Sequence, residues 1–140
     1  MFDLEPTLPF LASQRGITVW HQLNATPCEL PNDLLPNLIG VTLSPWILPT
    51  LTSSSIVWIS TGLIHADEIM ERQSADGLRC NYSRTLTSLT LERTVMDESM
   101  DLADFLVCLA ENLPLVERLS LWHCGERVCY RLVLLIKYVS

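Results

Sequence analysis

The feature that most constrains the fold of this chain is a six-residue pattern that recurs along it. An apolar residue is followed by two others, a second apolar residue, one other and a third apolar residue. The clearest copies are Leu38–Leu43, Leu86–Leu91 and Val116–Leu121, with looser copies at Ile17–Trp20 and Ile56–Ile59. The copies therefore start at residues 17, 38, 56, 86 and 116. Leucine-rich repeats recur every ~20–29 residues, so this spacing predicts a repeat architecture.

Each copy predicts a short strand, because its apolar residues alternate with others and threonine and valine are common in it. Two segments between the copies predict helices. In Asp101–Asn112 the apolar residues follow the helical period, and acids gather near the start, where the helix dipole favours them. A weaker helix is expected over Ala66–Leu78, with Ile69 and Met70 facing inward and Gly77 as its stop.

The alternation of strands with helices or turns predicts the fold class. A strand, a helix and a second strand in register pair in parallel, with the helix on one side. Proline-rich turns at 27–36 and 45–49 replace helices in the first half. We therefore expect an α/β fold: an irregular leucine-rich-repeat-like solenoid of short parallel strands, with helices or proline-rich turns on the outer side. Residues 1–140 are expected to form one domain, with the clearest repeats at 84–125 and a divergent end at 126–140.

The composition limits the partners of this chain. Hydrophobic residues make up 49% of it and charged residues 18%, which argues against disorder and suggests that some apolar surface needs a partner. The net charge of −7 repels phosphate backbones and anionic membrane surfaces, so nucleic-acid binding is not expected. Five scattered cysteines and an N-terminus unlike a secretory signal predict reduced thiols in the cytoplasm or nucleus.

An uncharged segment at 34–64 is the basis of an alternative hypothesis about function. Its length is sufficient to span a bilayer, which takes ~20 predominantly apolar residues. Pro36, Pro45, Pro49 and the hydroxyl-rich stretch 50–55 interrupt it, so a membrane-spanning helix is not expected. A small protein that associates with membranes through this segment is the second hypothesis.

The sequence gives little support for a catalytic or metal-binding site, so an enzyme is not expected. The chain has no Gly-x-Ser-x-Gly element and no glycine-rich loop. His123 beside Cys124, with Cys129 five residues on, is a single cluster, whereas structural zinc usually has ligands in paired short spacings. We expect no catalytic residue, no cofactor and no metal. A hydrolase or redox enzyme that pairs Cys124 or Cys129 with a histidine is the third hypothesis.

A family resemblance enters at the fifth copy of the pattern. The run Leu-Ser-Leu-Trp-His-Cys, residues 119–124, places a cysteine three residues after the last strand leucine. This spacing resembles the cysteine-containing leucine-rich repeats of F-box proteins. The run 86–93, a helix and the run 113–121 together look like the repeat region of fungal F-box-like proteins. The strong part covers Leu86–Cys124, and a looser match reaches back to Pro9.

The resemblance implies a role in substrate binding. In that family an N-terminal F-box docks on the adaptor of a cullin–RING ubiquitin ligase, and the repeats hold the substrate. No F-box helices precede the first repeat in this sequence. We therefore expect a fragment that is similar to the substrate-binding half of such a receptor.

The candidate binding surface is the outward face of the two clearest strands. Alternation turns the residues between the strand leucines away from the core. Arg118 and Trp122 are the expected anchors, because arginine and tryptophan are enriched at binding hot spots. The prediction is a non-enzymatic module that binds a protein. The predicted face comprises Thr87, Ser88, Thr90, Glu92, Glu117, Arg118, Ser120 and Trp122.

A sixth strand is expected in the apolar run Tyr130–Ile136. Terminal repeats usually need a polar capping unit, and none follows this run in the sequence. The C-terminal edge is therefore predicted to be open to self-association.

Overall fold

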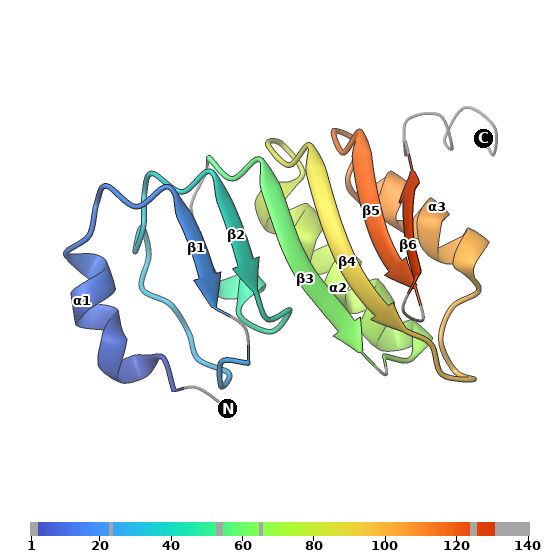
Figure 1. The fold of residues 1–140 in the computed structure, drawn as a ribbon, viewed down its shortest axis with the longest axis horizontal. Coiled ribbons are helices and arrows are strands. Elements are labelled where there is room, and N and C mark those ends of the chain that lie inside the picture. Colours follow the sequence, from blue (N-terminus) through green and yellow to red (C-terminus); the bar gives the residue numbers. More distant parts are fainter. Residues whose placement is uncertain (1–2, 23, 53–54, 65, 124–125, 131–140) are drawn as a thin grey trace.

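A six-stranded sheet forms the centre of the structure, a computed structural model that describes residues 3–22, 24–52, 55–64, 66–123 and 126–130. The strands lie side by side in sequence order (Figure 1). Strands β1 to β5 pair in parallel, and β6 pairs antiparallel with β5. The strands are β1 (Val19–Gln22), β2 (Gly40–Leu43), β3 (Trp58–Ile64), β4 (Ser88–Thr94), β5 (Arg118–His123) and β6 (Glu126–Tyr130).

The two longer helices occupy one side of this sheet (Figure 1). Helix α2 (Glu68–Tyr82) connects β3 to β4, and α3 (Leu102–Asn112) connects β4 to β5; both lie behind the sheet in Figure 1. Among the described residues of the earlier connections, the short 3-10 turn η2 (Leu48–Thr50) is the sole helical element. Before β1, the 3-10 turn η1 (Glu5–Thr7) leads into the short helix α1 (Leu8–Ala12). The predicted α/β class and parallel pairing are confirmed.

The core joins the inward side of the sheet to α2 and α3, and it continues into the N-terminal segment and the connection between β1 and β2. One residue from each of the five parallel strands occupies the same register position, and all five are buried. Each fully buried leucine or isoleucine of this kind contributes ~1.5–3 kcal/mol through removal of its apolar surface from water. The row consists of Trp20, Val41, Ile59, Leu89 and Leu119.

Helix α2 differs from its prediction in both its length and its buried face. It passes through Gly77, where the sequence predicted a stop, and ends at Tyr82. Ile69 and Met70, which were expected to face inward, are 67% and 51% exposed. The buried positions are Glu71, Ala75, Leu78 and Tyr82. The prediction was wrong because the first buried position is a carboxylate, Glu71. The apolar residues alone therefore do not show the helical period of the buried face.

The buried carboxylate of Glu71 is neutralised by Arg93 on β4. Nε of Arg93 donates to Oε2 of Glu71 at 2.6 Å. Oε1 of Glu71 accepts from the backbone N–H of Met100 at 2.8 Å, and Nη2 of Arg93 donates to the Met100 carbonyl. The guanidinium carbon lies 4.4 Å from the ring centroid of Phe105. This cluster therefore joins α2, β4 and the segment that leads into α3.

The uncharged segment 34–64 forms β2, η2 and all of β3. Its leucine and isoleucine side chains are largely core, which explains why the segment carries no charge. No helix within the described residues is long and apolar enough to cross a membrane. The buried apolar residues of the segment are Leu34, Leu35, Leu38, Val41, Leu43, Ile47, Leu48, Leu51, Ile56, Ile59 and Leu63.

Strand β6 begins before the expected sixth strand and runs in the opposite direction to β5. Only residues 124–125 separate it from β5. A parallel pairing needs a crossover of about a dozen residues or more, so a connection this short allows only a hairpin. Of the predicted strand Tyr130–Ile136, residues 131–136 lie outside the described residues, and self-association at this edge stays a prediction.

Candidate functional site

The side of the sheet opposite α2 and α3 carries the candidate site. In the described part of the chain, both of these helices lie on the far side, and α1 lies beside β1 (Figure 1). We call the exposed side the open face. Strand alternation assigns its residues. They are Val19 and His21 (β1), Gly40 and Thr42 (β2), Trp58, Ser60 and Gly62 (β3), Ser88, Thr90 and Glu92 (β4), Arg118, Ser120 and Trp122 (β5), and Arg127 and Cys129 (β6).

A row of short hydroxyl side chains crosses the middle of the open face. Successive strands place these residues in register, and the row runs His21, Thr42, Ser60, Thr90, Ser120, Cys129. At one end, Nδ1 of His21 and Oγ1 of Thr42 share a hydrogen bond of 2.7 Å. Towards the other end, Nε of Arg127 donates to Oγ of Ser120 at 2.8 Å. The row offers hydroxyls that both donate and accept hydrogen bonds.

Trp58 stands on the amino side of this row and lies across Gly40 of the neighbouring strand. A Cβ atom on residue 40 would come within 1.7 Å of the indole. Only glycine therefore allows the ring to take this position. The ring centroid of His21 lies 6.0 Å from that of Trp58. The two rings form an aromatic rim over β1 to β3.

A third row lies on the carboxyl side and holds two charged residues, Glu92 and Arg127. Gly62, Glu92, Trp122 and Arg127 occupy equivalent positions on β3 to β6. The guanidinium carbon of Arg127 lies 6.0 Å from the ring centroid of Trp122, whose side chain is 42% exposed. Glu92 is exposed and forms no ion pair with any described residue.

A groove of about 820 Å³ opens at the carboxyl ends of the strands, from the segment after β2 to β5. This volume lies within the ~300–1,000 Å³ that is usual for ligand pockets. Trp46 and Trp122 both line it, and Nε1 of Trp46 donates to the Ala25 carbonyl at 2.8 Å. The open-face hydroxyls of Thr42, Ser60 and Thr90 also line it. The groove thus combines indole surface with an array of hydroxyls.

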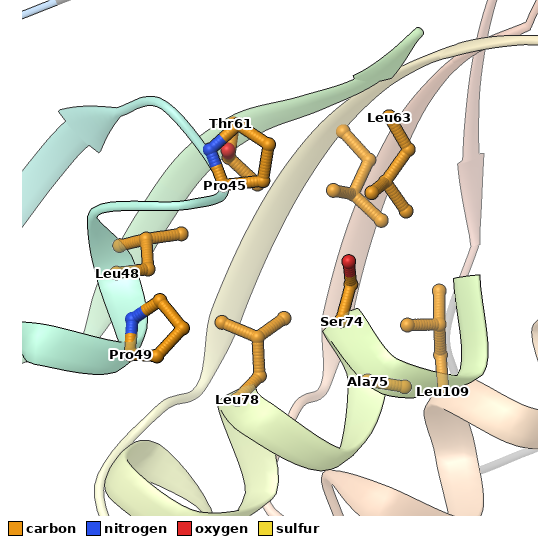
Figure 2. A pocket seen from close by; sticks show the side chains of 10 residues that line it. Pro45, Leu48, Pro49, Thr61, Leu63, Ser74, Ala75, Leu78 and Leu109 are labelled. Carbon is orange, nitrogen blue, oxygen red and sulfur yellow. The ribbon is translucent and has the colours of Figure 1, made fainter. Parts of the chain in front are cut away.

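A much smaller void of about 20 Å³ lies behind the sheet. Figure 2 shows Leu48 and Pro49 of η2 on one side of it and Leu78 of α2 on the other. A water molecule needs at least ~10–15 Å³ measured in this way, so the void has room for about one. Thr61 lines both this void and the groove, and its buried Oγ1 has no hydrogen-bond partner within the described residues.

Six of the eight predicted site residues lie on the open face. They form three cross-strand pairs, Ser88 with Arg118, Thr90 with Ser120, and Glu92 with Trp122. The outward direction predicted for Trp122 agrees with its exposure.

The other two predicted residues, Thr87 and Glu117, lie outside the open face. They precede β4 and β5, and the backbone N–H of Glu117 donates to the Thr87 carbonyl at 2.9 Å. Both are exposed at the amino edge of the sheet. Each stands two positions before an inward-facing leucine, Leu89 or Leu119. Alternation along a strand therefore assigns them to the opposite side from the other six residues.

Several residues of the open face were not predicted. Trp58, His21 and Trp46 lie in weaker copies of the pattern or beyond them. A signal for the hydroxyl row is nevertheless present in the sequence, because the fifth position of four copies holds a serine or threonine. Those four residues are Thr42, Ser60, Thr90 and Ser120.

Cys129, one of the two candidate thiols, is exposed on β6 and lies opposite Ser120 in the register of β5 and β6. Within the described residues, no group of three or more His, Cys, Asp or Glu side chains is placed to hold a metal ion. Burial raises the pKa of the Cys108 thiol, which favours its unreactive protonated form. The third hypothesis also named Cys124, which lies outside the described residues.

Comparisons of this chain with family models, curated proteins and solved structures find no match. Its function therefore has to be inferred from the open face and the groove.

Proposed function

We propose that this chain is a non-enzymatic module whose open face binds a segment of another protein. The observation that carries the proposal is the in-register row of hydroxyls from β2 to β5, on a side where the described residues place no helix. Trp58 and Trp122 flank the row. Hydroxyls supply adaptable hydrogen bonds and indoles supply large contact areas, which is the combination that protein-binding surfaces use.

The order of the strands supports a repeat-like reading of this surface. Sequential strands with α2 and α3 on one side are what a leucine-rich-repeat-like solenoid requires, since each unit then contacts only its neighbours. We propose that the chain is an irregular solenoid of this kind, similar to the substrate-binding repeats of F-box-type ubiquitin-ligase receptors. The free strand side is then the substrate side.

The lining of the groove favours binding over catalysis. Glu92 is the sole ionisable side chain among its described lining residues, and no histidine, cysteine or lysine accompanies it there. Histidine is the side chain that most often transfers protons in general acid–base catalysis. An exposed carboxylate next to hydroxyls and indoles is better suited to hold a ligand.

The proposal is tested by cross-linking capture with the tagged full chain in extracts of the organism that encodes it. The test variant, Arg118→Ala with Trp122→Ala, removes the two anchors of the open face. The matched control, Phe10→Ala with Arg84→Ala, removes one exposed aromatic and one exposed guanidinium elsewhere. We expect proteins that the wild type and the control capture to be lost from the test variant. Unchanged capture by a test variant with a wild-type circular dichroism spectrum would overturn the proposal.

A further inference from the structure

The groove at the carboxyl ends of the strands holds one unbalanced charge. Glu92 is its sole charged lining residue in the described part of the chain, and no described basic side chain pairs with it. Arg127, the nearest arginine in the same row, instead donates to Ser120 and approaches Trp122. The carboxylate is therefore free to accept hydrogen bonds from a cation that enters the groove.

Trp122 supplies the second half of a cation site. It lies opposite Glu92 in the register of β4 and β5, and it also lines the groove. A guanidinium or ammonium within ~6 Å of an indole centroid is attracted by the negative face of the ring. Arg127 already approaches this ring at 6.0 Å. The pair Glu92 and Trp122 therefore offers a carboxylate and an aromatic face side by side.

Hydroxyl side chains of the open face also line the wall of the groove. Ser60 and Thr90 lie opposite each other on β3 and β4 and supply two of them. A hydroxyl both donates and accepts hydrogen bonds, so these two can pair with the backbone of a polar occupant.

Other acidic side chains follow the carboxyl ends of the same strands. Asp67 comes after β3, and Asp97 and Glu98 come after β4. The net charge of the chain is −7. An acidic protein attracts cationic ligands and raises their association rate.

We infer that the groove binds a short basic segment of the partner protein, with one Lys or Arg side chain between Glu92 and Trp122. The inference rests on the proposed function and names the chemistry of its partner. Three strand spacings of about 4.8 Å separate β2 from β5, or roughly 14 Å. An extended peptide covers that span with about four residues at roughly 3.4 Å each. Its backbone then lies over the hydroxyls of Thr42, Ser60 and Thr90.

The test is a titration of the ¹⁵N-labelled full chain, followed through its indole N–H signals by NMR. The probe is the blocked peptide acetyl-Gly-Arg-Gly-Gly-amide. The matched neutral probe replaces its arginine with citrulline, which keeps the shape and removes the charge. We expect the indole signals of Trp122 and Trp46 to shift with the arginine peptide and to shift much less with the citrulline peptide.

Two variants locate the effect. Glu92→Gln is expected to weaken binding of the arginine peptide by up to about fivefold, because an exposed ion pair is worth up to ~1 kcal/mol. Glu117→Gln removes an exposed carboxylate at the opposite edge of the same sheet and is expected to leave the affinity unchanged. An equal loss with both variants would indicate general charge attraction and would overturn the site.

The remaining outcomes separate this inference from the proposed function. Equal shifts with both peptides would leave the open face as a protein-binding surface and would refute the basic specificity. Equal affinity for argininamide alone would show a site for a small cation and refute the peptide occupant. Absence of any shift in the indole signals would refute the basic segment, while the capture experiment would still decide whether the open face binds a protein.

Discussion

Glu71 on α2 and Arg93 on β4 form an ion pair in which both side chains are 1% exposed. Removing two charges from water is costly, and the remaining hydrogen bonds to Met100 and the contact with Phe105 offset part of that cost. The pair holds α2 against the strand that precedes the loop to α3. It therefore fixes the position of the helix whose N-terminal half borders the groove.

Breaking this pair is expected to destabilise the protein strongly. Glu71→Ala leaves the guanidinium of Arg93 buried and uncompensated, at a cost of about 3–5 kcal/mol in the free energy of unfolding. The exposed pair between Arg72 and Glu68 is the matched control, and Arg72→Ala is expected to cost much less than Glu71→Ala, because an exposed ion pair contributes little to stability. Urea unfolding measures both, and equal losses in the two variants would contradict the prediction.

Two glycines are expected to respond oppositely to alanine. Gly40→Ala drives a methyl group into the Trp58 indole and is expected to cost about 1–3 kcal/mol. Gly77 lies inside α2, where the nearest atom to an added Cβ is Cγ of Pro49 at 3.6 Å. Gly77→Ala is expected to stabilise by up to about 1 kcal/mol through helix propensity.

The contact between Gly40 and Trp58 can be checked by adding Trp58→Ala to Gly40→Ala. The double variant is expected to lose less stability than the two single losses combined, because the clash disappears with the ring. Thermal unfolding of the four proteins provides the measurement. Strict additivity would mean that the indole does not lie over residue 40.

Tyr82 is expected to make stability fall at alkaline pH. Its hydroxyl donates to the carbonyls of Leu48 and Leu51, and burial raises its pKa far above the usual value of 10.0. Above pH 10 the unfolded chain loses this proton and the folded chain keeps it. The free energy of unfolding therefore decreases as pH rises above 10, by about 1.4 kcal/mol per pH unit.

The variant Tyr82→Phe isolates this effect. It is expected to cost about 1–3 kcal/mol below pH 9, since two buried carbonyls lose a donor. Between pH 10 and 11 its free energy of unfolding is expected to decrease less steeply than that of the wild type. Parallel curves for the two proteins would show that Tyr82 ionises as freely in the folded chain as in the unfolded one.

The cysteines are expected to divide into two classes of reactivity. Cys80 and Cys129 are exposed, whereas Cys108 is buried and its pKa is raised by that burial. Iodoacetamide at pH 8 is expected to modify the first two in the native protein and Cys108 only after unfolding, as read by peptide mass spectrometry. Rapid native labelling of Cys108 would contradict its placement on the inward side of α3.

The positions of the strands and their parallel pairing were predictable because the pattern that indicates each strand lies within a few consecutive residues. Each copy of the pattern reports its own alternation, and a strand begins two residues after the start of each clear copy, as at Gly40, Ser88 and Arg118. The inward stripe of α2 was not predictable, since Glu71 becomes an inward residue only when Arg93 from a distant strand meets it. The same is true of Trp58, whose position depends on a glycine in another repeat.

The candidate site was also predictable only in part. Six of the eight predicted residues share the open face because alternation assigns them to it. The groove could not be inferred, because it combines β2 to β5 with Trp46 and the start of α2, which are far apart in sequence. The F-box-like resemblance stays a prediction, because it rests on spacing in residues 86–124.

The row of hydroxyls makes binding at this surface depend on the register of the strands. Ser60 and Ile59 are neighbours on β3, one in the row and one in the core. A slip of β3 by a single residue would exchange their sides, burying a hydroxyl and exposing an isoleucine. Any ligand that touches all four hydroxyls thus senses the alignment of four strands at once. A register shift in any of these four strands would therefore be detected as a loss of binding.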